Sequence, residues 1–184
     1  MVKSFFIVLC SAIFSSCVGQ TTLKDGTKVP SSSHKFVNKK KFTSKSYNEI
    51  DINYFYELGY TYNSDYNFDP IDEIYPAKWI KVLQFYPDGQ VREFAKEYSD
   101  ENTDTTGNRG VIYSKRNGVY IDFYGAVSNG SMQIITHKIK AQGDKIYMFE
   151  KPLLGALGGE TIYCRVFKKT GLIPENWKKH KASW

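Results

Sequence analysis

The amino-acid sequence predicts an all-β protein, a single antiparallel up-and-down meander of about eight strands that forms a small barrel. Short turn sequences that contain glycine, at 87–89, 117–118, 129–130 and 142–143, separate runs of β-branched and aromatic residues. Three of these turns follow one another at intervals of 12 to 13 residues, as in a β meander. With 184 residues, 24% of them charged and 41% hydrophobic, the chain has the size and composition of one globular domain.

The first predicted strand covers residues 50–62. Every even position there is apolar or aromatic, from Ile50 to Tyr62, whereas the odd positions include Asp51 and Glu57. This period of two is the pattern of a strand with one buried face. Eight strands of this kind enclose an interior that side chains fill or that holds one small ligand. The other predicted strands span residues 78–86, 90–98, 110–115, 119–127, 131–139, 145–150 and 161–168.

Residues 1–16 have the layout of a lipoprotein signal peptide. Lys3 gives a basic start, and an uncharged apolar run follows. That run has about 11 residues, which is short of the roughly 20 that a membrane-spanning helix needs. The sequence Ile13-Phe14-Ser15-Ser16-Cys17 resembles a bacterial lipobox, and the resemblance implies cleavage before Cys17 and lipidation of its thiol. The alternative is an ordinary secretory signal that is cleaved near Gly19-Gln20.

The rest of the chain divides into three predicted segments. Residues 17–46 carry no apolar period, so they are predicted to be a lipidated cysteine and a flexible Lys-rich tether with an end-to-end distance of roughly 30 Å. Five lysines lie between positions 35 and 45, and each would contribute about 1 kcal/mol near an anionic lipid surface, which is a second interpretation of this segment. Residues 47–177 are predicted to be the barrel domain, and residues 178–184 a basic C-terminal tail.

The chain resembles the lipocalin-like lipoproteins that are common in Bacteroidota. Besides Cys17, the resemblance rests on the hairpin Leu83-Gln84-Phe85-Tyr86-Pro87-Asp88-Gly89-Gln90-Val91 and on the closing sequence Leu172-Ile173-Pro174-Glu175-Asn176-Trp177. It implies a meandering barrel in the cell envelope, anchored by lipid to the outer membrane and facing the periplasm. A small hydrophobic ligand or an envelope protein is the partner that this resemblance implies.

The strand 119–127 contains a candidate ligand site. Phe123 lies among alternating apolar residues, and Gly125 and Ala126 thin the strand toward one end, where we expect an apolar mouth. An apolar, glycine-rich connection at 152–159 is a candidate lid for that mouth, or it folds back onto the barrel end. The predicted ligand-binding residues are Phe123, Gly125, Leu153, Leu154 and Leu157.

The predicted function is a non-enzymatic, lipid-anchored binding module of the cell envelope, for a small apolar ligand or a partner protein. No cofactor and no nucleic-acid partner is predicted. The alternative function is the binding of carbohydrate or peptidoglycan fragments through an exposed tyrosine face. That face would be formed by Tyr54, Tyr56, Tyr60 and Tyr62.

Three other patterns concern chemistry. Cys164 and His137 lie on predicted strands and could form a thiol–imidazole pair, but Cys164 alternates with apolar residues and is expected to face the core. The loop at 100–104 has oxygen ligands at alternate positions, as in the first half of a calcium loop, but it lacks the glycine and glutamate that complete one. The sequence Asp104-Thr105-Thr106 resembles an O-glycosylation site, with Thr105 as the acceptor on an exposed loop. No metal site and no catalytic residue is predicted.

Overall fold

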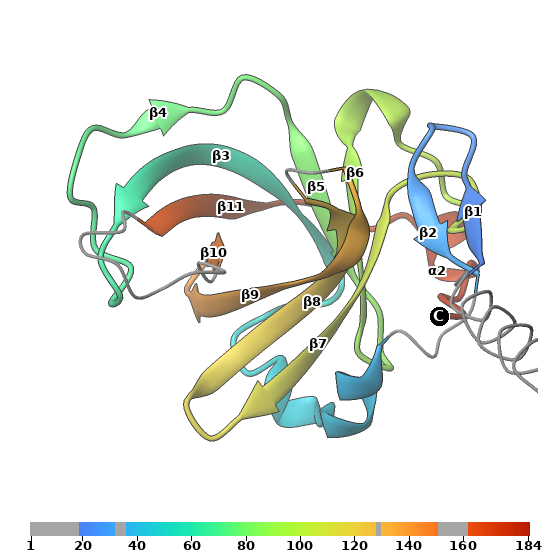
Figure 1. Ribbon diagram of the computed structural model, residues 1–184, viewed down its shortest axis with the longest axis horizontal. Coiled ribbons are helices and arrows are strands. Elements are labelled where there is room, and N and C mark those ends of the chain that lie inside the picture. Colours follow the sequence, from blue (N-terminus) through green and yellow to red (C-terminus); the bar gives the residue numbers. More distant parts are fainter. Residues whose placement is uncertain (1–18, 32–35, 128–129, 151–161) are drawn as a thin grey trace, which may run out of the picture.

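The computed structural model of the protein describes residues 19–31, 36–127, 130–150 and 162–184. Eight antiparallel strands each pair with the next along the chain, and the last strand pairs with the first, so the sheet closes into a barrel (Figure 1). The predicted eight-stranded meander is confirmed. The barrel strands are β3 (Tyr54–Ser64), β5 (Lys81–Phe85), β6 (Gln90–Ala95), β7 (Asn108–Lys115), β8 (Gly118–Ala126), β9 (Met132–Gln142), β10 (Lys145–Glu150) and β11 (Ile162–Leu172).

The two ends of the barrel differ in how the strands are connected. At one end, which we call the turn end, β5 joins β6, β7 joins β8 and β9 joins β10 through two to four residues. At the other end, the loop end, the connections have five to 16 residues. The longest of them leads from β3 to β5 and carries the short strand β4 (Tyr75–Pro76), which pairs with β3 (Figure 1).

Apolar side chains fill the barrel interior toward the turn end. The segment 42–52 closes this end, and Tyr47 packs edge-on against Phe42 and Phe85 at ring-centroid distances of 5.3 and 6.1 Å. Gly89 has a φ of +83°, and a Cβ at this position would lie 2.6 Å from the Phe42 ring, so the turn needs glycine. The interior side chains, each 0 to 5% exposed, are Leu83, Phe85, Val91, Ile112, Ile121, Ile139, Ile146, Met148 and Phe167.

A β-bulge at Gly59 interrupts the alternation of β3. Val166 of β11 pairs with Tyr60, but the next residue, Phe167, pairs with Leu58. The extra residue turns the side chains that follow it to the other face of the sheet. The even positions therefore do not share one face: Tyr56 packs in the barrel interior, whereas Tyr62 packs in a cluster with Cys164 and Phe149.

The predicted flexible tether is wrong for the part of it that the structure describes. Strands β1 (Gln20–Thr22) and β2 (Lys28–Pro30) form a hairpin beside the barrel, and two 3₁₀ turns follow, η2 (Val37–Lys41) and η3 (Ser44–Ser46) (Figure 1). Val29 is 0% exposed and Phe36 is 3% exposed. The segment has no apolar period, but single apolar residues attach it to the barrel surface, and these were not recognised in the sequence.

The predicted C-terminal tail is not a free tail either. After a single helical turn, α2 (Glu175–Lys178), the chain ends on Trp184, which is 2% exposed and packs against Tyr86. The indole Nε1 of Trp184 donates a hydrogen bond to the carbonyl oxygen of Gly110 at 2.8 Å. Arg109 lies over the Trp184 ring, with Cζ at 5.2 Å from its centroid. These contacts bury the end of the chain against β7.

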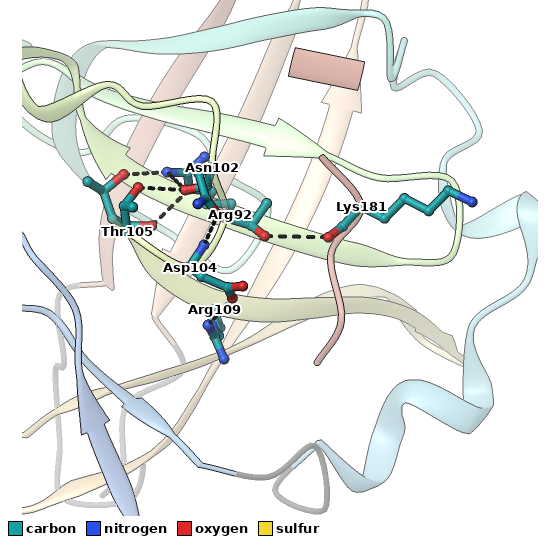
Figure 2. A network of polar contacts seen from close by, with 8 residues as sticks. Arg92, Asn102, Asp104, Thr105, Arg109 and Lys181 are labelled. Carbon is teal, nitrogen blue, oxygen red and sulfur yellow. Dashed lines mark hydrogen bonds and ion pairs between the residues drawn. The ribbon is translucent and has the colours of Figure 1, made fainter. Parts of the chain in front are cut away.

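A buried arginine organises the connection between β6 and β7, which contains the 3₁₀ turn η4 (Lys96–Tyr98). Arg92 is 0% exposed and donates to the carbonyl oxygens of Thr106 (2.9 Å), Asp100 (2.7 Å) and Asn102 (3.3 Å), as Figure 2 shows in part. The guanidinium draws these oxygens inward, so the loop folds over Arg92 and does not extend into solvent.

No helix among the described residues is long and apolar enough to span a bilayer.

Candidate functional site

The loop end of the barrel contains a hollow with a volume of about 610 Å³. It lies above the filled interior, at the ends of six barrel strands. The tip of the β1–β2 hairpin reaches over it with Gly26, Thr27 and Lys28. We call this hollow the first lobe. The barrel residues that line it are Lys81, Glu93, Asn108, Phe123, Tyr124, Gly125, Ala126, Met132, Ile135, His137, Tyr163 and Arg165, together with Gly130 of the β8–β9 connection.

One wall of the first lobe is ionic. Glu93 is 5% exposed, and its carboxylate accepts hydrogen bonds from Arg165 Nη1 at 2.6 Å, Lys81 Nζ at 3.4 Å and Asn108 Nδ2 at 3.4 Å. Burial alone would raise the pKa of this carboxyl, but Arg165 and then Lys81 lower it to about 2. Glu93 is therefore a carboxylate at neutral pH, and it is already bound by two cations.

His137 lies beside this ionic wall and is 5% exposed. Burial, and then the nearby positive charge of Arg165, lower its pKa to about 3, so the imidazole is neutral at pH 7. Its ring packs edge-on against Phe123 at a centroid distance of 5.8 Å. The Nδ1 atom is buried and has no hydrogen-bond partner among the described residues.

The opposite wall of the first lobe is apolar and includes Phe123, Gly125, Met132 and Ile135. Gly110 fixes the position of the Phe123 ring, because a Cβ at Gly110 would lie only 2.5 Å from that ring. Gly125 leaves space above Phe123, and a Cβ there would meet Ile135 Cδ1 at 3.3 Å. The predicted residues Phe123 and Gly125 thus line the cavity, but the mouth is half ionic and not wholly apolar as expected.

A second hollow of about 480 Å³ adjoins the first. We call it the second lobe. Lys81, Tyr163 and Arg165 line both lobes and form the wall that they share. The remaining residues of the second lobe come from β3 and from the long β3–β5 connection, and they are Leu58, Thr61, Tyr75, Pro76, Ala77, Lys78 and Trp79.

The predicted tyrosine face does not exist as a surface. Tyr56 is 1% exposed, and its hydroxyl accepts a hydrogen bond from the Asp51 amide at 2.8 Å; Tyr62 is 2% exposed, and its hydroxyl donates to the Phe68 carbonyl at 2.6 Å. Tyr54 and Tyr60 are partly buried on opposite sides of the bulge. Exposed aromatic side chains gather elsewhere, on the β3–β5 connection and β11, where Tyr75 is 50%, Trp79 73% and Tyr163 52% exposed.

The other predicted site residues are placed as follows. Thr105 is not on an exposed surface: it is 6% exposed, and its hydroxyl donates to the Asn102 carbonyl at 2.7 Å, because Arg92 holds the loop inward (Figure 2). Leu153, Leu154 and Leu157 lie outside the described residues. No group of three or more metal-ligating side chains occurs within the described ranges.

Cys164 and His137 do not face one another. Arg165 lines the mouth, so its neighbour Cys164 points to the other face of β11, away from His137. Cys164 is 0% exposed, as expected, but it lies in the outer cluster with Tyr62 and not in the barrel interior. Burial raises the pKa of its thiol, which therefore stays protonated.

No sequence pattern predicts Lys81, Glu93 or Arg165 as site residues, and the pattern around His137 indicates only a possible pair with Cys164. Each of the four looks like an ordinary polar position on a strand, and only closure of the barrel brings them together. Comparison of the chain with protein-family models, with curated proteins and with solved structures gives no match. A function for this protein must therefore be inferred from the geometry of the mouth.

Proposed function

We propose that the protein is a non-enzymatic binding module that takes a small amphipathic anion in the loop end of its barrel. The observation that carries this proposal is the charge balance of the first lobe. Three cations, Lys28, Lys81 and Arg165, line it against one carboxylate, Glu93, and His137 is neutral. An anionic group satisfies the excess positive charge, and the Phe123 wall opposite takes an apolar part of the same ligand.

The barrel interior argues against a long acyl chain as the ligand. Below the first lobe, Ile121, Ile146 and Phe167 are 0% exposed and belong to one packed cluster. An acyl tail would have to displace these side chains from a close-packed core, which is unfavourable. The proposed ligand is therefore short, with a ring or a branched group in place of a tail.

Anilinonaphthalene sulfonate is a suitable probe, because it is aromatic and anionic and its fluorescence rises in an apolar site. Phenylnaphthylamine, which has the same rings without the sulfonate, is the matched neutral control. We expect saturable binding of the sulfonate and binding of the neutral compound that is weaker by about tenfold or more, the factor that about 1.4 kcal/mol of charge recognition provides.

Two variants test the position of the probe. Lys81→Met should weaken the sulfonate without weakening the neutral compound, and Gly125→Phe should block both by filling the space next to Ile135. Fluorescence titration of the full chain in detergent measures all four affinities. Equal binding of both probes, unchanged by Gly125→Phe, would place the probe elsewhere and refute the proposal.

We also propose that Cys17 carries a lipid that anchors the protein to the outer membrane, with the barrel facing the periplasm. The lipobox-like sequence before Cys17 supports this proposal. Two or three acyl chains on one cysteine give stable anchoring, since each buried CH₂ contributes about 0.8 kcal/mol. Cys17→Ser should release the protein from the membrane fraction, and a variant that stays membrane-bound in high salt would contradict the anchor.

A further inference from the structure

The two lobes of the mouth lie side by side and share one wall. Lys81, Tyr163 and Arg165 line both of them, so a ligand that contacts this wall lies within reach of both lobes. The second lobe adds about 480 Å³ to the about 610 Å³ of the first. This space exceeds what one small ring needs, and it suits a ligand with at least two ring-sized units.

From this arrangement we infer that the ligand is an anionic oligosaccharide, with one sugar ring in each lobe and a carboxylate at the shared wall. The inference rests on the proposed function and names the ligand class of the same site. The additional evidence is the set of aromatic and polar side chains that line the second lobe.

The second lobe presents aromatic rings to solvent. Trp79 is 73% exposed, Tyr75 is 50% exposed and Tyr163 is 52% exposed, although such large side chains usually bury most of their surface. Rings of this kind offer flat apolar faces on which the C–H face of a pyranose ring can lie. Thr61 and Lys78 in the same lobe supply polar groups at the edge of such a ring.

The mixture of groups in both lobes favours a sugar over a purely apolar molecule. Asn108, His137 and Phe123 all line the first lobe, and Thr61, Tyr75 and Trp79 all line the second. A purely apolar ligand offers no hydrogen bond to polar groups in such walls. A polyhydroxylated ring supplies hydrogen-bonding groups at its edge and an apolar face in the same unit.

The charges of the site favour an acidic sugar over a neutral one. Lys28, Lys78, Lys81 and Arg165 line the two lobes together, against the single carboxylate of Glu93. Arg165 and Lys81 are central in this set because they stand in the shared wall. A carboxylate bound there contacts both cations, whichever lobe its own sugar ring occupies.

The test compares ligand lengths. Galacturonic acid, trigalacturonate and the neutral trisaccharide maltotriose are titrated into the full chain in detergent by calorimetry. We expect trigalacturonate to bind about tenfold more tightly than the monosaccharide, because the added rings contact the exposed aromatic side chains. Maltotriose should bind more weakly than trigalacturonate by a similar factor, because it has no carboxylate for the shared wall.

Trp79→Ala should abolish the roughly tenfold gain with length, because it removes the most exposed ring of the second lobe. Tyr66→Ala is the matched control, because Tyr66 is also an exposed aromatic residue of the β3–β5 connection, at 67%, but it lies outside both lobes. This variant should keep the gain with length.

Equal affinities for the monosaccharide and trisaccharide, with the sulfonate probe still bound, would overturn the oligosaccharide inference and leave the proposed function standing. Tighter binding of triglutamate than of trigalacturonate would overturn it in favour of an acidic peptide. Absence of binding for both the sulfonate probe and galacturonic acid would refute the proposed function itself.

Discussion

The two ends of this barrel use the same strands for different purposes. At the turn end, short turns and the segment 42–52 close a fully apolar interior, in which Met148 and Phe167 are 0% exposed. At the loop end, the same strands present Glu93, His137 and Arg165, and long connections leave a hollow between them. The stabilising core and the proposed binding site are therefore separated along the barrel axis, so changes at the two ends should have different effects.

The largest expected effect is on stability at the turn end. Phe167→Ala should lower the free energy of unfolding by about 3 to 5 kcal/mol, because it leaves a cavity in a packed core. Denaturant unfolding monitored by circular dichroism measures the loss. At the loop end, Trp79→Ala should change stability by no more than about 0.5 kcal/mol, since that side chain is mostly exposed. A loss below about 1 kcal/mol for Phe167→Ala would mean that the turn end is not the stabilising half.

A smaller loss is expected when the ionic wall of the loop end is broken. Arg165→Met removes the closest partner of the buried Glu93 carboxylate, and Lys81 and Asn108 remain. We expect a loss of about 3 kcal/mol, mostly from the carboxylate that is left without its main partner. The double variant with Glu93→Gln should recover most of this stability, and an additive further loss in the double variant would contradict the explanation.

The loop end should also make stability depend on pH. The pKa of His137 is lowered from 6.5 to about 3 by folding, so below pH 6.5 the unfolded chain binds a proton that the folded chain does not. The free energy of unfolding therefore decreases as the pH is lowered, by about 2 kcal/mol from pH 8 to pH 5. Denaturant midpoints measured across this range test it, and in His137→Gln the contribution should vanish.

Glu93 causes a second loss of folding stability at lower pH. Its folded pKa of about 2 lies below the ordinary 4.5, so it stabilises the fold above pH 4.5, and this stabilisation is lost as the pH falls toward 2. Glu93→Gln should remove this lower step and keep the one from His137. A pH profile of His137→Gln identical to that of the unaltered chain between pH 8 and 5 would rule out the histidine as the cause.

The smallest loss of stability from a buried residue is expected in the outer cluster of Tyr62, Phe149 and Cys164, which belongs to neither end. Cys164→Ala should lower stability by about 1 to 2 kcal/mol without changing the affinity for the sulfonate probe, because the thiol is buried on the face opposite the mouth. In the native chain the peptide that contains Cys164 should stay unlabelled by an alkylating reagent, as mass spectrometry can show. Rapid labelling would indicate that this cluster opens.

The sequence predicts the eight strands because their signals are local. Glycine turns and alternation between polar and apolar residues can be recognised within about ten residues, and all eight predicted strands overlap the observed ones. The bulge at Gly59 is not local, since it is defined by pairing with Val166 and Phe167 more than one hundred residues later. It divided the predicted tyrosine face between the two sides of the sheet.

The candidate site was predicted only in its apolar half. Phe123 and Gly125 belong to one strand, and their pattern is visible there. Glu93, His137 and Arg165 come from three strands, and nothing in the sequence near Glu93 or His137 shows that these two side chains are buried. Which side chains meet across a closed barrel depends on the register between strands, and the sequence pattern of a single strand does not contain that register.

If Cys17 carries the proposed lipid, the folded β1–β2 hairpin limits how far the barrel stands from the membrane. Only Val18 separates the proposed lipid carrier Cys17 from Gly19, whose carbonyl oxygen accepts a hydrogen bond from the Ser31 amide at 3.0 Å. Two residues span at most about 7 Å, in contrast to the roughly 30 Å of a free tether. Such a protein would move in two dimensions along the lipid surface, with its β1–β2 hairpin held next to the headgroups. Its encounters would be with molecules that diffuse close to that surface.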